Sequence, residues 1–360
     1  MDLVDVLQHA VTQGASDIHL CSEHAPWIRV QGELCITSCG NLQRATGESC
    51  DSNSAEYTRN ENVYRQQNAH SACWVTEALA SFMEKNVSAH FLEGHEVDFS
   101  FTAPSLGRFR ANVFKNLKGT GAVLRYIRDA IPSLAEINAP KVLPDLLKSA
   151  GLFLVTGPTG SGKSTTLAAL LHHLNQTTQQ HIITLEDPIE FIHTNQQCLV
   201  TQREIGHHSK SFSHALRAAL REDPDVILVG ELRDLETIRL ALTAAETGHL
   251  VLASLHTRSA AASVERIVDV FDSVEKTLVR TQLSEALIGV VSQTLYRPLK
   301  CDMQRAVFEV MVVTPAIRHL IREGKTTQIH NAIQTGAAYG MQTMAQAMQA
   351  AQALGGAVAL

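Results

Sequence analysis

Residues 155–175, VTGPTGSGKSTTLAALLHHLN, carry the clearest chemical signature in the chain. Gly157, Gly162, Lys163 and Ser164 fit the pattern G-x-x-x-x-G-K-[ST] without a gap. Glycines let backbone N–H groups face a phosphate, the lysine reaches the β- and γ-phosphates, and the serine hydroxyl can bind Mg²⁺. We therefore expect a nucleoside-triphosphate site formed by Gly157, Pro158, Thr159, Gly160, Ser161, Gly162, Lys163, Ser164 and Thr165, with Mg²⁺ at Ser164.

The sequence on either side of this loop supports that expectation. LFLVT is an apolar run typical of a buried strand, and STTLAALLHHL has apolar residues at helical spacing. A helix that begins at the loop adds the positive end of its dipole to the phosphate site. The alternative interpretation is a glycine turn without a ligand, and it is disfavoured because the loop stands between a strand and a helix.

Acidic side chains follow the next apolar run along the chain. IITL is expected to form a buried strand, and Glu186, Asp187 and Glu190 stand at its end. Ligands bind at the carboxyl ends of strands in open α/β sheets, so these groups can hold Mg²⁺-bound water or orient the attacking water. The alternative interpretation of these residues alone is an acidic turn in solvent.

A further strand, Val226–Val229, ends in Gly230 and Glu231. Because Gly230 occupies the position of a simple Mg²⁺-holding aspartate, Glu231 is the better candidate for polarising the water. Asp234 is expected to cap the helix that follows, and Gly248 to close it.

Histidines mark both ends of the run HLVLASLHT, with His249 at its start and His256 at its end. A shared metal ion is disfavoured, because this spacing along a strand does not bring both rings to one ion. We favour His256 as a hydrogen-bonding sensor near the γ-phosphate.

The pattern of elements predicts an α/β protein of two domains. Residues 1–128 mix helix signals with alternating strands, and 39–72 are so polar that we expect a mobile insertion. Residues 129–148 contain three prolines and are expected to be a linker that ends in a helix. Residues 149–360 begin with alternating strands and helices, which indicates a parallel sheet.

Composition narrows the classes of function. The chain has 360 residues, is 45% hydrophobic and 18% charged, and carries a formal charge of −6, so it can bury a core and is not held on nucleic acid by bulk charge. No transmembrane run or secretory signal is present in the sequence, and we expect a cytoplasmic protein.

The seven cysteines are expected to be reduced thiols. A zinc site is the alternative, but its spacing fits no short paired-ligand pattern, and scattered free thiols are favoured. The residues concerned are Cys35, Cys39, Cys50 and Cys73, with His70 nearby.

Taken together, the motifs resemble the type IV pilus retraction ATPases, the PilT-like branch of the secretion-ATPase superfamily. The resemblance covers nearly the whole chain except residues 39–72. The segments that carry it are GASDIHL, RFRANVF, GPTGSGKSTTLAA, TLEDPIEF, QREI, ALREDPDVILVGELRDLETIRLALTAAETGHLV, LHT and AIRHLIREGK.

The resemblance implies a PAS-like N-terminal domain, a RecA-like ATP-hydrolysing domain and a ring of six subunits. It makes Glu190 the catalytic acid of an Asp box and Glu231 the Walker B glutamate, acting with Lys163, and it places His249 and His256 in a His box. Arginines of one subunit lie beside a neighbour's nucleotide in this family, and the candidates are Arg108, Arg110, Arg125 and Arg128.

The resemblance also implies a C-terminal retraction motif, in which His319 replaces the usual asparagine. The spacing predicts a helix that begins at Pro315, with an apolar stripe and a second face that carries two arginines; an ordinary amphipathic surface helix is the alternative. The motif residues are Ala316, Ile317, Arg318, Leu320, Ile321, Arg322 and Glu323.

The expected function is therefore a cytoplasmic motor, peripheral at the inner membrane face, that uses ATP and Mg²⁺ to retract type IV pili in twitching motility or DNA uptake. Its expected partners are an inner-membrane platform protein (PilC-like) and other pilus ATPases, with no direct nucleic-acid contact. An assembly or type II secretion ATPase is an alternative, but it usually carries a four-cysteine insert, and only Cys198 and Cys301 follow residue 150. A non-hydrolysing regulator is a second alternative, disfavoured by the intact Lys163, Glu190 and Glu231.

Overall fold

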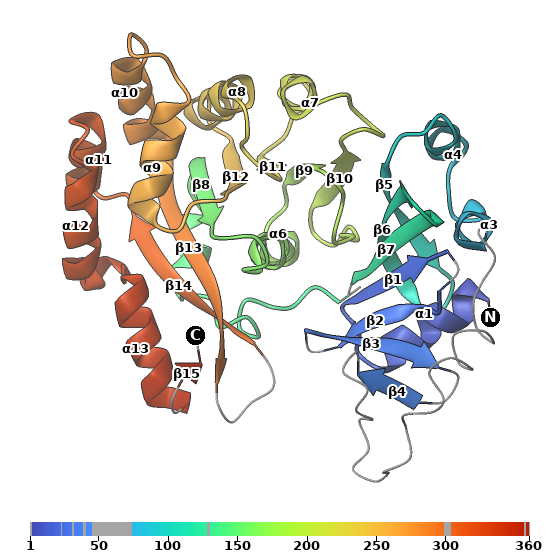
Figure 1. Cartoon of the computed structure of the whole chain (residues 1–360). Helices are drawn as coiled ribbons and strands as arrows, with labels where there is room; N and C mark the ends of the chain where they lie inside the picture. The colour runs from blue at the N-terminus through green and yellow to red at the C-terminus, as the bar shows by residue number, and fades with distance from the viewer. Residues whose placement is uncertain are drawn as a thin grey trace. The chain divides into compact units, whose positions relative to one another are not determined.

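The computed structural model describes residues 2–22, 24–30, 32–38, 41–44, 74–127, 130–298, 304–355 and 358–359. The chain divides into two compact units, Met1–Asp129 and Ala130–Leu360 (Figure 1). Of the expected insertion 39–72, only Asn41–Arg44 is described, and it forms a strand, so this part of the segment belongs to the sheet. Arg128, His70, Cys39, Cys50, Cys73 and Cys301 lie outside the described residues.

The first unit is an antiparallel sheet with helices packed on it. Its strands follow the order β4-β3-β2-β1-β7-β6-β5. The described elements are α1 (Leu3–Thr12), β1 (Asp17–Cys21), β2 (Trp27–Val30), β3 (Glu33–Ser38), β4 (Asn41–Arg44), α3 (Trp74–Ala80), α4 (Lys85–Leu92), β5 (Val97–Ala103), β6 (Gly107–Asn116) and β7 (Gly119–Ile127).

Alternation along the strands builds the core of this unit. Strand β5, VDFSFTA, buries every second side chain, and the helical spacing of α1 buries Leu3, Val6, Leu7 and Ala10 in the same cluster. The segment WVTEALASFMEK, residues 74–85, has a helical pattern throughout, but the structure has two helices, α3 and α4, separated at 81–84. The break places Phe82 and Met83 partly against the core, so packing overrides the local helix signal.

The second unit has a mostly parallel sheet in the order β10-β9-β11-β12-β8-β13-β14. Only β14, among these described strands, runs antiparallel to its neighbour, and the short β15 pairs with the far end of β13. The strands are β8 (Gly151–Thr156), β9 (His181–Glu186), β10 (Leu199–Glu204), β11 (Val226–Val229), β12 (Leu250–Leu255), β13 (Leu287–Pro298), β14 (Arg305–Val312) and β15 (Val358–Ala359).

Helices cover both faces of this sheet. Helices α5 and α6 pack on one face, while α7 to α12 pack on the other. Their bounds are α5 (Leu143–Leu146), α6 (Lys163–Thr177), α7 (Phe212–Ala219), α8 (Leu235–Glu246), α9 (Ala260–Asp269), α10 (Lys276–Ala286), α11 (Pro315–Arg322), α12 (Ile329–Thr335) and α13 (Met344–Gly355), with 3₁₀ turns η1 (Thr326–Gln328) and η2 (Ala337–Tyr339).

Strand β8 shows how both layers hold the sheet. Leu152 and Leu154 point to the α7–α12 side, whereas Phe153 and Val155 point to the α5–α6 side, and all four are fully buried. Strands β8, β9, β11 and β12 are parallel, so their carboxyl ends meet at one edge of the sheet. The expected α/β architecture, with a parallel sheet around the loop-bearing β8, is confirmed.

The segment expected to be a linker belongs to the second unit. Leu143 and Leu147 are buried in one cluster with Phe153 of β8 and Leu170 of α6. Apolar side chains in the linker therefore add to the core that supports the glycine-rich loop.

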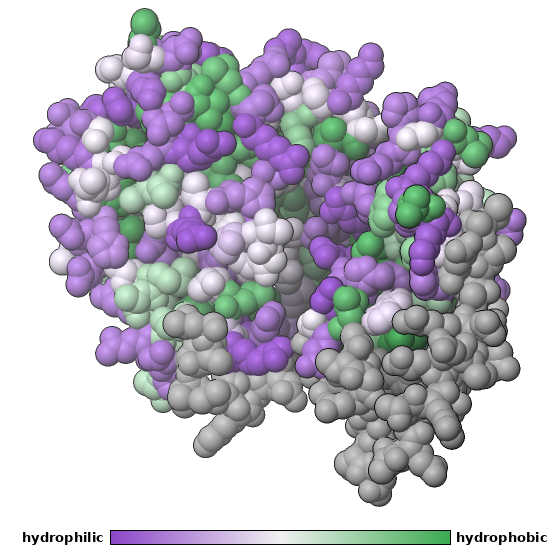
Figure 2. All heavy atoms as spheres, in the orientation of Figure 1, coloured by the Kyte–Doolittle hydropathy of each residue, from purple (hydrophilic) through white to green (hydrophobic). Residues whose placement is uncertain are grey.

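The described surface is mainly hydrophilic on the face shown in Figure 2, as expected for a charged fraction of 18%. None of the helices in the described ranges is both long enough and apolar enough to span a bilayer.

Candidate functional site

The glycine-rich loop joins the carboxyl end of β8 to the first turn of α6. Gly157 has φ 149°, and a Cβ there would lie 2.4 Å from the backbone oxygen of Gln293. Gly162 has φ 87°, and a Cβ there would lie 2.9 Å from Nε2 of Gln293. Both glycines are thus required by the backbone conformation and by the close approach of β13.

Lys163 is the first residue of α6, and its ammonium lies over the loop. Its Nζ donates to the carbonyl oxygens of Gly157 (3.0 Å) and Pro158 (3.1 Å). Burial lowers the pKa of Lys163, and the negative charges of Glu231 and Glu190 oppose this shift. Two carboxylates therefore favour a charged lysine at the loop.

Two serines in the loop fit an anionic ligand in different ways. Ser161 is buried, and its Oγ has no hydrogen-bond partner in the described structure. Ser164 lies exposed in the first turn of α6, where helix N–H groups are free of intrahelical partners. The remaining loop residues Pro158, Thr159 and Gly160 are exposed, and Thr165 is half-buried.

Glu231 follows β11 and is held by two basic side chains. Arg233 Nη2 lies 2.8 Å from its Oε2, and His256 Nε2 lies 3.1 Å from its Oε1. Burial raises the pKa of Glu231, but hydrogen bonds and positive charge from Arg233 and His256 outweigh it, so the net pKa is lowered. The carboxylate is therefore ionised at neutral pH and is a weak base.

His256 joins this carboxylate to the loop lysine. Its Nδ1 lies 3.4 Å from Nζ of Lys163, while its Nε2 faces Glu231. The two ring nitrogens of His256 thus contact the loop lysine on one side and a carboxylate on the other. Residues from the ends of three elements, β8–α6, β11 and β12, thus form one continuous polar chain at the same sheet edge.

The acidic segment after β9 adds a carboxyl group with a raised pKa. Glu186 Oε1 accepts hydrogen bonds from Thr184 Oγ1 (2.6 Å) and Gln202 Nε2 (3.2 Å). Burial raises the pKa of Glu186 to about 7, although these hydrogen bonds lower it. Asp187 is exposed, and Glu190 is half-buried with its charge felt at Lys163.

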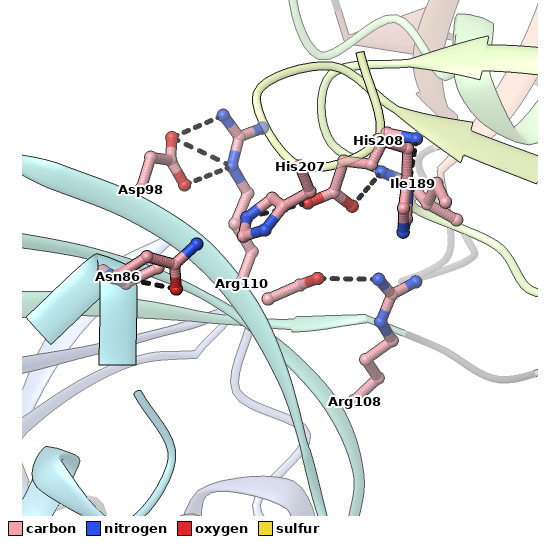
Figure 3. Close-up of polar contacts among 10 residues, drawn as sticks. Asn86, Asp98, Arg108, Arg110, Ile189, His207 and His208 are labelled. Carbon is pink, nitrogen blue, oxygen red and sulfur yellow. Dashed lines mark hydrogen bonds and ion pairs between the residues drawn. The ribbon is translucent and has the colours of Figure 1, made fainter. Parts of the chain in front are cut away.

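Strand β10 fixes the shape of this acidic segment. The Glu204 carboxylate accepts from the Ile189 N–H at 3.0 Å, and the Glu204 N–H donates to Nδ1 of His208 at 2.9 Å (Figure 3). Gln202 accepts from the His193 N–H at 2.8 Å and donates to the Phe191 carbonyl at 2.8 Å. The QREI motif therefore supplies the side chains that order residues 186–193.

The structure separates the two histidines of the expected His box. His249 precedes β12 and His256 follows it, so a strand length of about 20 Å lies between them. The His249 ring contacts the carbonyl oxygen of Ala244 (2.9 Å) and the hydroxyl of Thr247 (3.2 Å) at the C-terminus of α8. Within one chain, His249 lies at the sheet edge opposite the loop.

The described candidate arginines share one face of the first unit's sheet. Arg110 binds Asp98 through Nε (3.0 Å) and Nη2 (2.7 Å), and Arg108 Nη2 donates to Ser100 Oγ at 2.6 Å (Figure 3). Arg125, opposite Arg110 in the strand register, binds Asp17 at 2.8 Å. Asp98 and Asp17 thus set the direction of Arg110 and Arg125, and the hydroxyl of Ser100 contacts Arg108.

The retraction-motif helix is α11, and it begins at Pro315 as predicted, with Thr314 as its N-cap. Ile317 and Ile321 are fully buried and Leu320 is partly buried in the same cluster, whereas Ala316 is exposed. Glu323 is exposed just beyond the helix.

The two arginines of α11 are bound to helix α10. Arg318 Nη1 donates to the carbonyl oxygens of Ser284 (3.2 Å) and Glu285 (3.1 Å) and to Glu285 Oε2 (3.0 Å). Arg322 Nη2 donates to Glu285 Oε1 at 2.6 Å. Arg318 therefore satisfies carbonyls at the C-terminus of α10, a role the sequence did not indicate.

Several residues of the site escaped the sequence interpretation. Gln293 touches the loop from a position far along the chain, and nothing local marks it. Arg233 stands two residues after Glu231, in the segment GELRD, and Gln202 and Glu204 stand in QREI; the motifs marked all three without indicating their partners.

In the described part of the chain, no group of three or more His, Cys, Asp or Glu side chains is arranged to hold a metal ion. Cys35, the one described member of the zinc alternative, is buried in the core of the first unit.

Comparison with known proteins identifies the class. The family described as type II/IV secretion system protein matches residues 108–355, and the chain belongs to this family.

Two relatives match along most of the chain. The chain is 47% identical to the type IV pilus retraction ATPase PilT of Pseudomonas aeruginosa, over 96% of this chain and 92% of that protein. It is 46% identical to a twitching motility protein of Neisseria gonorrhoeae, over 90% of this chain and 84% of that protein.

A solved structure agrees with these sequence matches. The crystal structure of the pilus retraction motor PilT with bound ADP superimposes with a TM-score of 0.84 at 37% identity, covering 100% of this chain and 95% of that one. The likeness extends over both units of the chain.

Proposed function

We propose that this chain is an ATP-hydrolysing motor that drives the retraction of type IV pili. The single observation that carries the chemistry is the polar chain from Lys163 through His256 to Glu231, at the sheet edge where the glycine-rich loop lies. The likeness to retraction ATPases over 96% of the chain supports the biological role.

The geometry supports a division of labour within the site. ATP supplies the phosphoanhydride bond that is broken, and Mg²⁺ supplies positive charge beside it. Lys163 directs its N–H donors at the carbonyl oxygens of Gly157 and Pro158, and phosphate oxygens would replace these acceptors. Glu231 orients the attacking water as an ionised group, since its lowered pKa makes it a poor proton acceptor.

The metal-binding residues remain part of this proposal. Ser164 is the candidate direct ligand, and Glu186 and Asp187 are candidates that act through bound water. Mg²⁺ retains several waters in such sites and needs one or two protein oxygens, so a compact ligand cluster is not required. Glu190 would act as the second acidic group beside the phosphates, because its charge already bears on Lys163.

The assembly that we propose is a homohexameric ring with shared sites. Three arginines, Arg108, Arg110 and Arg125, lie on one face of the sheet, on the paired strands β6 and β7. Their neighbours orient these side chains, so they can contact a second subunit in a fixed geometry. A head-to-tail contact that closes on itself gives a ring in which each subunit donates to the next.

Mixing two defective chains tests this assembly. Phosphate release per subunit should rise with protein concentration until rings form. Mixed Arg125→Ala and Lys163→Ala chains should regain part of the lost activity, because some interfaces then hold both intact halves. A rate independent of concentration, with no recovery in mixtures of any of the three described arginines, would refute shared sites.

The partner that we propose is an inner-membrane platform protein at the base of the pilus, contacted from the cytoplasmic side, with other pilus ATPases as additional partners. The test uses a strain that lacks this gene. Retraction predicts more surface pili with loss of twitching or DNA uptake, and complementation should reverse both changes. Loss of pili in the deletion strain would instead indicate an assembly ATPase.

A further inference from the structure

Gln293 on β13 is a buried glutamine with both ends of its amide bound at the glycine-rich loop. Its exposed fraction is 2%. Its Nε2 donates to the carbonyl oxygen of Ser161 at 2.6 Å, and its Oε1 accepts from Thr166 Oγ1 at 2.7 Å. One side chain therefore ties together strand β13, the loop and helix α6.

The Ser161 carbonyl decides which way the amide of Gln293 faces. A carbonyl oxygen can only accept, so the NH₂ group points at the loop and Oε1 is turned toward α6, where the Thr166 hydroxyl donates to it. Thr166 is itself 1% exposed. Loss of Gln293 would leave the buried Thr166 hydroxyl without this acceptor, and loss of the Thr166 hydroxyl would leave Gln293 Oε1 without this donor while Nε2 keeps its bond to Ser161.

The contact between β13 and the loop leaves no spare volume. A Cβ at Gly157 would lie 2.4 Å from the Gln293 carbonyl oxygen, and a Cβ at Gly162 would lie 2.9 Å from Gln293 Nε2. Beside them, the buried hydroxyls of Thr156 and Ser292 lie 2.8 Å apart and join β8 to β13. The loop is therefore held against β13 through backbone and side chain together.

The orientation of one peptide group follows from this contact. The carbonyl of Ser161 and the N–H of Gly162 belong to the same planar trans peptide, so they point in opposite directions. Because Gln293 holds the Ser161 carbonyl toward β13, the Gly162 N–H is directed away from β13, out of the loop. Such N–H groups are what a glycine-rich loop offers to phosphate.

We propose that Gln293 is a positioning residue for nucleotide binding: it orients the Ser161–Gly162 peptide so that the Gly162 N–H faces the phosphates. It acts through the backbone and does not touch the nucleotide. This inference rests on the proposed nucleotide site, because it assigns a further residue to the same reaction.

The test replaces Gln293 by methionine, which keeps the length of the side chain and removes both hydrogen bonds. The Kd for ADP and for ATP should rise about ten- to a hundred-fold, the value of one hydrogen bond to a charged group. KM for ATP should rise by the same factor, while kcat at saturating ATP changes much less, because the substitution removes an interaction made with the bound nucleotide.

A matched control separates this effect from loss of packing. Gln342, which lies between η2 and α13, donates to the Phe308 carbonyl of β14, the strand that pairs with β13, at 2.8 Å. Gln342→Met makes the same chemical change and should lower the melting temperature without changing Kd. If Gln293→Met and Gln342→Met have equal Kd values at equal loss of melting temperature, the proposal is wrong.

The threonine offers a second route if Gln293→Met does not fold. Thr166→Val removes the donor that anchors Gln293 Oε1, so it should weaken ADP binding in the same direction as Gln293→Met but by less, because Nε2 keeps its bond to Ser161. Thr166→Ser keeps the hydroxyl and should bind ADP like the parent chain. Equal ADP binding by Thr166→Val and Thr166→Ser would overturn the proposal. A parent chain that binds neither ADP nor ATP would refute the nucleotide site itself, which is a different result.

Discussion

The glycine-rich loop and helix α11 both carry sequence motifs, but the structure uses the two sets of residues differently. Around the loop, His256 contacts both Lys163 and Glu231 at the edge of the sheet where the parallel strands end. On α11, Ile317 and Ile321 are fully buried, and the arginines on the other face bind helix α10. One motif places chemical groups where we propose that a nucleotide binds, and much of the other is occupied inside the protein.

This contrast shows that a motif can be recognisable for two physical reasons. Residues that hold a ligand need exposure and a defined charge, which the loop region provides. Residues that hold a helix in place need burial and partners, which α11 provides through Ile317, Ile321 and Glu285. Substitutions in the two regions should therefore separate nucleotide chemistry from mechanical work.

The largest effect is expected for Lys163→Ala. The substitution removes the positive charge that stabilises the phosphates, so the rate of phosphate release should fall about a thousand-fold. The fold should survive, since the loop glycines and Gln293 remain. The matched control is Lys148→Ala, which removes an exposed lysine paired with Asp145. Near-normal turnover in Lys163→Ala would exclude the loop as the catalytic site.

A smaller effect is expected for Glu231→Gln. The change keeps the shape of the side chain and removes the charge that orients water, so turnover should fall about a hundred-fold, near the lower end for such groups because the carboxylate is a weak base. Binding of ATP, measured by equilibrium titration, should persist. Glu236→Gln, at an exposed glutamate paired with Arg217, is the control. Loss of binding with unchanged turnover per bound nucleotide would assign the water to Glu190 instead.

Helix α11 should show the opposite pattern. Arg318→Ala and Leu320→Ala should leave phosphate release within a few-fold of normal yet abolish pilus retraction in cells. Leu320→Ala should also lower the free energy of unfolding by about 1–2 kcal/mol, because its side chain is only partly buried. The measurement pairs purified protein with the same variant in a deletion strain.

Glu285→Gln tests whether the arginines of α11 hold this helix against α10 or instead serve to contact a partner. It weakens the contacts of Arg318 and Arg322 with α10 while leaving both arginines in place. If Glu285→Gln also abolishes retraction, then retraction requires the placement of α11 against α10. Joint loss of hydrolysis and retraction in all these variants would make α11 a structural support alone.

The smallest expected effect concerns His193, which is buried beside the acidic segment. Burial lowers the pKa of His193 to about 4, with a smaller contribution from the charge of His172. The unfolded chain therefore binds a proton near pH 6.5 that the folded chain does not, and stability falls as pH drops from 6.5 to 4, by at most about 1.4 kcal/mol per pH unit. His193→Gln should reduce this slope in urea unfolding followed across that range. An unchanged slope would show that folding does not lower the pKa of His193.

The sequence predicted what depends on neighbouring residues. Strand β8, helix α6 and the caps Asp234 and Gly248 follow from apolar runs, glycines and short polar side chains that act within a few positions. The alternating strands and the helical pattern of the first unit followed in the same way, because alternation in β5 and helical spacing in α1 need no distant partner.

What the sequence could not give are contacts between distant parts of the chain. Gln293 reaches Ser161 across 132 positions, and Glu285 meets Arg318 across 33. The break between α3 and α4 depends on the packing of Phe82 against the core of the first unit. The capping contact of His249 depends on where α8 ends. Each is decided by packing that no local pattern encodes.

The connection between β14 and α11 is short. Only Val313 and Thr314 lie between Val312 and Pro315, the Val313 N–H is bound to the Ile288 carbonyl at 3.1 Å, and Thr314 caps the helix. Because only two residues join β14 to α11, this connection can change its length very little. Strand β14 is paired along its length with β13, the strand that carries Gln293, so a shift of this hairpin should move the N-terminus of α11 with it.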